Sequence, residues 1–225
     1  MKRLVLFVEG EGDVGGAPVL VGRMVHELPD ELQGTLFVDP DPFRVQGIHH
    51  LTGRVAGNWT RHLNSARSTR RNLGGILLLL DGDADRVEGS PFCVVDTARA
   101  LAEAARTAAG GKLFSVAVVF VRQEFESLLI AGYQSLPGQR PGVALPPAIE
   151  NAPRDAKGWL DDHLDGGYKP TEDQARLSGA VRFDDIRTAG LRSFARLEHA
   201  LREIATAVQS GQHIVSPALP PPPGS

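Results

Sequence analysis

Two apolar segments that end abruptly in acidic residues constrain the fold more than any other feature. The first, LVLFVEGEGD at residues 4–13, runs into Glu9, and the second, GILLLLDGDAD at residues 75–85, runs into Asp81. A continuous apolar run of this length is typical of a strand that is buried on both faces. Because such strands occur almost only in parallel sheets covered on both sides, the rest of the chain has to supply helices.

Strand-like and helix-like segments alternate over residues 1–135. Strands are predicted at residues 3–9, 35–39, 74–81 and 113–121, and helices at residues 17–28, 58–71, 94–109 and 123–136, with Asn58 as the cap of the second helix. This order predicts an α/β fold. We expect a mostly parallel sheet of four strands or slightly more, with helices on both faces.

The remainder of the chain differs in composition. Residues 136–154 are rich in proline and are predicted to form a connection. Residues 155–208 contain helical segments and are predicted to form a C-terminal extension that packs on the core 1–135; its last helix has Ser193 as the expected cap. Residues 209–225, which end in SPALPPPPGS, are predicted to be a disordered tail.

Composition excludes several classes of protein. The one cysteine, Cys93, excludes an intrachain disulfide framework and a multi-cysteine zinc site, and it fits a reducing compartment. The first apolar run is short and acid follows it, so it indicates a strand rather than a signal peptide. No run approaches the roughly 20 apolar residues of a membrane helix, so we expect a cytoplasmic protein. The net charge of -3 excludes neither nucleic acid nor small anions as partners.

Three acidic clusters directly follow predicted strands: Glu9–Asp13, Asp81–Asp85 and Glu124–Glu126. If the strands are parallel, their carboxyl ends share one edge of the sheet, where ligands bind in such folds. Mg²⁺ and Mn²⁺ prefer carboxylate and water oxygens, and two such ions can hold a phosphodiester for hydrolysis. The sequence therefore predicts a Mg²⁺ or Mn²⁺ site, although any single acid could instead be a solvated strand end.

The acids differ in their expected roles. Residues two apart in an extended chain point the same way, so Asp81 and Asp83 can share an ion. Glu9 ends the neighbouring strand and could bridge to an ion or act as general acid or base. The full set of candidate ligands is Glu9, Asp81, Asp83, Asp85, Glu124 and Glu126.

These residues also carry a family resemblance. Glu9–Gly10 after the first strand, together with the DGD of residues 81–83 after a later one, resembles the TOPRIM fold of topoisomerases, primases and OLD-type nucleases. The motifs VEGEGD, LLLLDGDAD, VRQEFESLL, KGWL and GYKPTEDQARLSGAVRFDDIRTAGLRSFARL resemble a TOPRIM-like bacterial family of unknown function, DUF4276, from residue 4 to about residue 200.

The resemblance implies that Glu9, Asp81 and Asp83 serve Mg²⁺-dependent chemistry on phosphodiesters. Asp13 matches a further acid of the family and is expected to support the site from behind the ligands. Gly12 stands where relatives often have threonine, which weakens the case for a hydroxyl ligand there. The family is often linked to phage-defence gene neighbourhoods, so the resemblance implies a role in phage defence or DNA repair, beside an ATPase partner.

A long basic interval precedes the second acidic cluster. No acidic residue lies between Asp41 and Asp81, and the interval contains Arg61, Arg67, Arg70 and Arg71. Arginines beside a metal site are expected to hold the phosphate backbone of DNA or RNA. The same arginines could instead pair with acids on a solvated helix face. Trp59 could stack on a base, but a core position is favoured.

Three functions remain open from the sequence. The first is a Mg²⁺- or Mn²⁺-dependent phosphodiester hydrolase, a nuclease. The second is a phosphatase with Asp81 as nucleophile, although such enzymes usually place this motif near the chain start and before a threonine. The third is a non-catalytic regulatory or interaction subunit that works beside an ATPase, since the chain has no ATPase motif. A homo-oligomer is compatible with all three.

Overall fold

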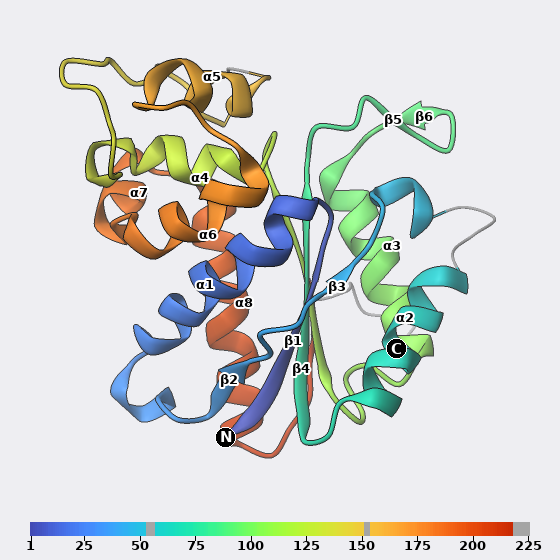
Figure 1. Cartoon of the computed structure of the whole chain (residues 1–225). Coiled ribbons are helices and arrows are strands. Elements are labelled where there is room, and N and C mark those ends of the chain that lie inside the picture. Colours follow the sequence, from blue (N-terminus) through green and yellow to red (C-terminus); the bar gives the residue numbers. More distant parts are fainter. Residues whose placement is uncertain (53–56, 151–153, 218–225) are drawn as a thin grey trace.

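The computed structural model describes residues 1–52, 57–150 and 154–217 (Figure 1). One sheet contains six strands: β1 (Lys2–Val8), β2 (Leu36–Val38), β3 (Phe43–Arg44), β4 (Leu73–Asp81), β7 (Ser115–Val121) and β8 (Val215–Ser216). Their order is β2-β1-β4-β7-β8, with β3 also pairing with β1, and every described pair is parallel. The predicted α/β class with a mostly parallel sheet is confirmed.

The central strand β4 shows why these segments form a sheet with two covered faces. Seven consecutive residues within it are buried. Leu77 and Leu79 pack into the core on one face, whereas Ile76, Leu78 and Leu80 pack into the core on the other. Each such side chain contributes about 1.5–3 kcal/mol on burial, so the unbroken apolar run is the energetic basis of the layered fold.

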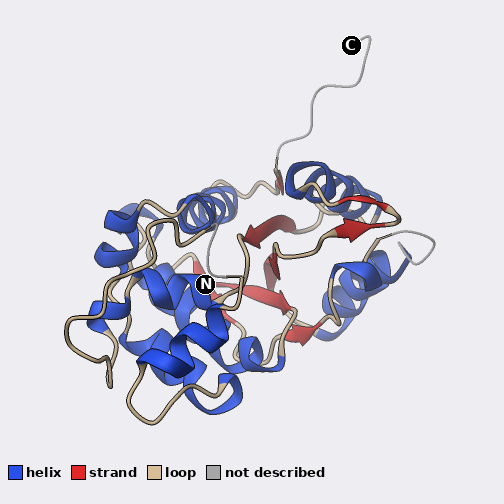
Figure 2. Ribbon diagram, turned by 90° about the horizontal axis from the view of Figure 1, so that it is seen from above, coloured by secondary structure: helices blue, strands red, loops and turns tan. Residues whose placement is uncertain are grey.

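Helices cover both faces of the sheet, as Figure 1 shows and as the view from above in Figure 2 confirms. On one face lie α2 (Gly57–Thr69) and α3 (Val94–Thr107), and on the other lie α1 (Glu11–His26) and α8 (Arg192–Gln209). The remaining helices are α4 (Glu126–Ala131), α5 (Ala156–His163), α6 (Pro170–Ala180) and α7 (Phe183–Ala189), with short turns η1 (Asp30–Leu32), η2 (Ile48–His50) and η4 (Tyr133–Ser135). Trp59 is fully buried and donates its indole N–H to the Leu101 carbonyl at 3.0 Å, so its predicted core position is confirmed. In the part of the chain that is described, no helix combines the length and apolar character needed to cross a membrane.

The C-terminal segment belongs to the sheet more closely than the sequence indicates. The apolar face of α8 packs on β7, and its Leu197, Leu201 and Ile204 share one core with Leu4 of β1. After α8, β8 adds a parallel strand beside β7. The prediction of disorder from residue 209 is therefore wrong as far as residue 217, and residues 218–225 lie outside the described ranges. A strand of two residues leaves no periodic pattern that a sequence could reveal.

The predicted cap of the last helix is also wrong. α8 begins at Arg192, one residue before Ser193. One carboxylate oxygen of Glu150 accepts both the backbone N–H of Ser193 at 2.8 Å and its hydroxyl at 2.7 Å. Glu150 thus satisfies a first-turn N–H from outside the helix. It lies in the connection 136–154, which has no helix in its described residues 136–150; residues 151–153 lie outside them.

The first helix begins earlier than the predicted range 17–28. α1 begins at Glu11 rather than at residue 17, so Gly12 and Gly16 are helical. A Cβ atom at Gly16 would lie only 2.6 Å from Cγ of Gln174, and one at Gly12 would clash with Oε1 of the same side chain. These glycines therefore allow α1 and α6 to pack closely, which offsets their low helix propensity.

Candidate functional site

The three predicted acidic clusters come together at the carboxyl edge of the sheet. In the parallel register Val8 of β1 lies opposite Leu79 of β4, so Glu9, which follows β1, and Asp81, the last residue of β4, lie close together. One carboxylate oxygen of Glu9 accepts the backbone N–H of Asp81 at 3.4 Å. Asp81 in turn accepts the backbone N–H of Phe125 at 2.9 Å through Oδ1. The expected convergence of the three strand ends is therefore present in the structure.

Asp13 stabilises the turn that holds Glu9. Its Oδ2 accepts the backbone N–H of Gly10 at 2.8 Å, and its Oδ1 accepts an amide N–H of Gln174 at 2.7 Å. Only 8% of Asp13 is exposed. A carboxylate with both oxygens occupied by protein donors can position its neighbours, which agrees with the supporting role expected for Asp13.

Glu124 and Glu126 are held by α5 and by the segment before α6. Glu124 accepts hydrogen bonds from the backbone N–H of Ala156 at 3.0 Å and from the ammonium group of Lys157 at 3.1 Å. The second oxygen of Glu126 lies 3.7 Å from Nζ of Lys157, while its first accepts the Tyr168 hydroxyl at 2.9 Å. Among the described residues, Lys157 is the one basic side chain that pairs with either glutamate.

Burial and neighbouring negative charges disfavour the ionised form of the carboxylates at this edge of the sheet. Burial raises the pKa of Glu9, and the charges of Asp83 and Asp13 raise it further. Burial also raises the pKa of Asp81 well above its ordinary value, with further contributions from Asp13, Glu126 and Glu9. The site therefore has an excess of negative charge that favours either protons or a bound cation.

Lys157 offsets only part of this charge. Burial raises the pKa of Glu126 to about 7, and the nearby ammonium group of Lys157 opposes that rise. Burial lowers the pKa of Lys157, but the charges of Glu126, Asp81 and Glu124 outweigh it and raise the pKa overall. Lys157 is therefore a cation beside Glu124 and Glu126. Its charge also lowers the pKa of Glu9 and Asp81, but neither of these acids forms an ion pair with a residue that the structure describes.

The predicted metal ligands are not all equally available. Asp85 is exposed and pairs with Arg154 at 2.7 Å, and Glu124 and Glu126 are engaged by Lys157. In the ranges that the structure describes, no three acidic, histidine or cysteine side chains gather closely enough to hold an ion. The donors that best fit a hard cation are Glu9, Asp81 and the exposed Asp83, whose oxygens are the type that Mg²⁺ and Mn²⁺ prefer.

The basic interval lies elsewhere than expected. Arg70 and Arg71 precede β4, whereas Asp81 ends it, so a strand of nine residues separates them, which corresponds to roughly 25 Å. Arg70 pairs with Asp39 at 2.8 Å and with Asp41 at 2.9 Å. The prediction that these arginines flank the acidic cluster is wrong, because α2 runs away from that edge before β4 begins. Arg61 and Arg67 are exposed on α2.

Sequence reasoning missed three residues of this site: Lys157, Tyr168 and Gln174. Lys157 lies among carboxylates and pairs with Glu124 and Glu126. All three belong to the motifs KGWL and GYKPTEDQARL, which served above only to identify a family. No local pattern in the sequence indicates these contacts, because each of the three side chains meets an acid more than 30 residues away in the chain.

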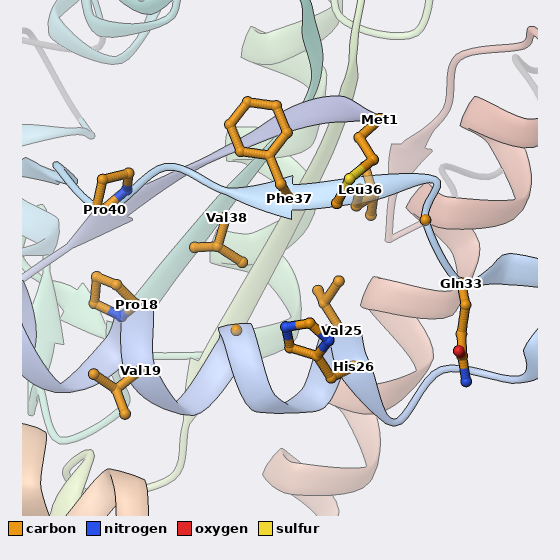
Figure 3. A pocket seen from close by; sticks show the side chains of 12 residues that line it. Met1, Pro18, Val19, Val25, His26, Gln33, Leu36, Phe37, Val38 and Pro40 are labelled. Atoms are coloured by element: carbon orange, nitrogen blue, oxygen red, sulfur yellow. The ribbon is translucent and has the colours of Figure 1, made fainter.

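Two cavities lie near the sheet. One of about 650 Å³ lies beside Gly82 and Asp83, next to the acidic edge. The other, of about 520 Å³, lies between α1 and β2 (Figure 3). Its lining is apolar apart from Gln33 and His26, and β2 pairs with the amino-terminal half of β1. The second cavity is therefore remote from Glu9 and Asp81.

Comparisons with known proteins give one match. No curated protein and no solved structure matches the chain. The family model of Domain of unknown function (DUF4276) matches residues 8–202, which include Glu9, Asp81, Lys157 and Gln174. The match covers well over half of the chain, and the chain therefore belongs to the DUF4276 family.

Proposed function

We propose that this protein is a Mg²⁺- or Mn²⁺-dependent phosphodiester hydrolase that acts as a nuclease. The observation that carries the proposal is the placement of Glu9 beside Asp81 at the carboxyl edge of a parallel sheet. Burial and neighbouring acids raise the pKa of both. Buried carboxylates that repel one another destabilise a fold, and such groups are typical of functional sites. A divalent cation bound between them would relieve the repulsion.

The residues divide into ligands and supports. Glu9, Asp81 and Asp83 would hold the ion, which when bound polarises a phosphoryl oxygen and lowers the pKa of a bound water. Asp13 fixes the turn at Gly10 and so orients Glu9. Lys157 keeps Glu124 and Glu126 in place and supplies a positive charge that can contact a phosphate oxygen.

A TOPRIM-like identity is part of this proposal. Glu9 and the DGD of residues 81–83 end adjacent parallel strands, an arrangement that supports the resemblance to TOPRIM proteins. The proposed setting in phage defence or DNA repair, and an ATPase as partner, rest on the family resemblance.

One observation favours a different function. In the described part of the chain the acids do not surround a common point, and Lys157 occupies the space between two of them. A non-catalytic subunit with a site closed by its own lysine fits these facts. A phosphatase is less well supported, because Oδ1 of Asp81 already accepts the Phe125 N–H.

Metal binding and cleavage can be tested together. Mn²⁺ at 100 times its Kd is expected to stabilise the protein by about 2.7 kcal/mol, which raises Tm by roughly 5–10 °C. We also expect Mn²⁺-dependent cleavage of labelled single- or double-stranded DNA or RNA. Glu9→Gln is expected to abolish both effects. Glu11→Gln, which changes an exposed acid two residues away, is expected to keep them. Cleavage of none of these substrates, with no shift in Tm, would overturn the proposal.

Gly47 gives a second test of Glu9. Gly47 has φ +87°, and a Cβ atom there would lie 2.9 Å from one carboxylate oxygen of Glu9. Gly47→Ala should therefore displace that carboxylate and weaken Mn²⁺ binding by about 10-fold. Gly34→Ala is the matched control, because Gly34 has φ +73° but open space around its Cβ position. Equal Mn²⁺ affinities of the two variants, measured by calorimetry, would exclude a role of Glu9 as ligand.

A further inference from the structure

The cavity beside Asp83 lies against the part of β7 that has no pairing with β8. β8 pairs only with Val116 and Ala117 of β7, and the cavity begins beyond them, at Val118 and Phe120. It ends at Gly82 and Asp83, the loop that follows β4. The volume of about 650 Å³ is in the range typical of small-molecule sites. A ligand in this cavity would therefore lie next to Asp83, one of the three proposed metal ligands.

Arginines dominate the charge of this cavity. Arg122, Arg154, Arg192 and Arg196 line it, together with the acids Asp83 and Glu150. Arg154 is paired with Asp85, and Arg196 with Glu203. Arg122 and Arg192 are exposed, and neither forms an ion pair with any residue in the described ranges. Two guanidinium groups thus remain available for an anion, and their planar donors suit phosphate oxygens.

The position of Arg192 also favours binding of an anion in this cavity. Arg192 is the first residue of α8, an 18-residue helix whose first turn contains no acid. A helix amino terminus carries partial positive charge and normally favours acids nearby. The Glu150 carboxylate already accepts the Ser193 N–H at this end, and the exposed Arg192 adds a positive charge that a phosphate in the cavity can offset.

The cavity also offers an apolar surface and an unused polar atom. Phe92 is half-buried and packs edge-on against Phe120, with 5.6 Å between ring centroids. A base or a sugar can pack on such a surface. Gln123 has φ +67°, and its buried Oε1 has no hydrogen-bond partner among the described residues. A carbonyl oxygen in that position can accept a hydrogen bond from an N–H or O–H group of a ligand.

We propose that this cavity holds a nucleotide of the nucleic-acid strand next to the scissile phosphate, with Arg122 and Arg192 on its phosphates. The identity of the substrate rests on the proposed function. Arg122 and Arg192 then form the binding surface for nucleic acid, in place of the predicted Arg61, Arg67, Arg70 and Arg71. A free mononucleotide has the same phosphate chemistry, so the test has to separate the two sources.

Binding without cleavage provides the first measurement. In EDTA, the Arg122→Ala/Arg192→Ala variant should bind labelled single strands of about 12 nucleotides at least about 10-fold more weakly than the unchanged protein. The slope of log K against log salt should fall by about 1.4, because each lost phosphate contact contributes about 0.7. Arg106→Ala/Arg202→Ala removes two other exposed arginines and should leave affinity unchanged. Weaker binding by Arg67→Ala/Arg71→Ala, with full binding by the cavity variant, would overturn the proposal.

The single cysteine provides the second measurement. Cys93 is exposed and lines the cavity, and the chain has no other cysteine. A bound DNA or RNA strand should therefore slow alkylation of Cys93 by N-ethylmaleimide. If AMP protects Cys93 and neither strand does, the cavity binds a free nucleotide, and the proposal that it holds part of a strand is wrong. If DNA, RNA and AMP all fail to protect Cys93, the cavity binds no nucleotide and the whole proposal is wrong. Because EDTA is present throughout, the outcome is independent of whether metal-dependent cleavage is found.

Discussion

Asp81→Asn is expected to abolish metal-dependent cleavage and, at the same time, to raise the Tm of the metal-free protein. The two effects have one cause. Asp13, Glu126 and Glu9 all disfavour a negative charge on Asp81, and burial disfavours it more. Asparagine removes that charge but keeps an oxygen that can accept the Phe125 N–H, so the local structure should persist.

The expected magnitudes differ greatly. Loss of a residue that holds the reacting centre typically lowers kcat by about 10⁴-fold. Relief of repulsion at a functional site typically stabilises by about 1–2 kcal/mol, and for a chain of this length that corresponds to roughly 2–8 °C in Tm. Calorimetric melting in EDTA and a cleavage assay in Mn²⁺ measure the two effects on one preparation.

Asp162→Asn is the matched control for Asp81→Asn. Asp162 is exposed, and its side chain has no ion pair with the residues that the structure describes. Its replacement should change stability by less than about 0.5 kcal/mol and leave cleavage intact. A fall in the Tm of Asp81→Asn below that of the unchanged protein, in EDTA, would show that Asp81 is not under electrostatic strain.

The sequence predicts the acidic edge because its signals are local. Continuous apolar runs identify β1 and β4, and parallel pairing then brings Glu9 next to Asp81 without further information. The α/β class follows from the same runs and the helices between them. These features depend on neighbouring residues, so one sequence is enough to predict them.

The rest depends on contacts between distant segments. Lys157 and Gln174 reach the acids from more than 30 residues away in the chain, and no local pattern indicates that contact. The early start of α1 depends on packing against α6, which overrides the low helix propensity of Gly12 and Gly16. The position of Arg70 does follow from the sequence. A residue just before a strand lies at the amino end of that strand, so Arg70 lies far from Asp81, which ends β4.

Lys157→Met is expected to destabilise the protein more than any other single change of a charged residue in the site. It leaves Glu126, which is 1% exposed, and Glu124, whose side chain is 13% exposed, without their cation. Breaking a fully buried ion pair costs about 3–5 kcal/mol. Since the side chain of Lys157 is 43% exposed, water screens part of that charge, and we expect about 2 kcal/mol.

A second substitution separates charge from packing. Adding Glu126→Gln to Lys157→Met should recover most of the lost stability, because it removes the buried charge and keeps an oxygen that can accept the Tyr168 hydroxyl. Lys112→Met changes an exposed lysine that pairs with no described residue and should have little effect. Thermal melting should place Lys157→Met roughly 4–8 °C below the unchanged protein. If the double variant melts no higher than Lys157→Met alone, the loss comes from packing of the lysine side chain, and the charge balance proposed for Glu124, Glu126 and Lys157 is wrong.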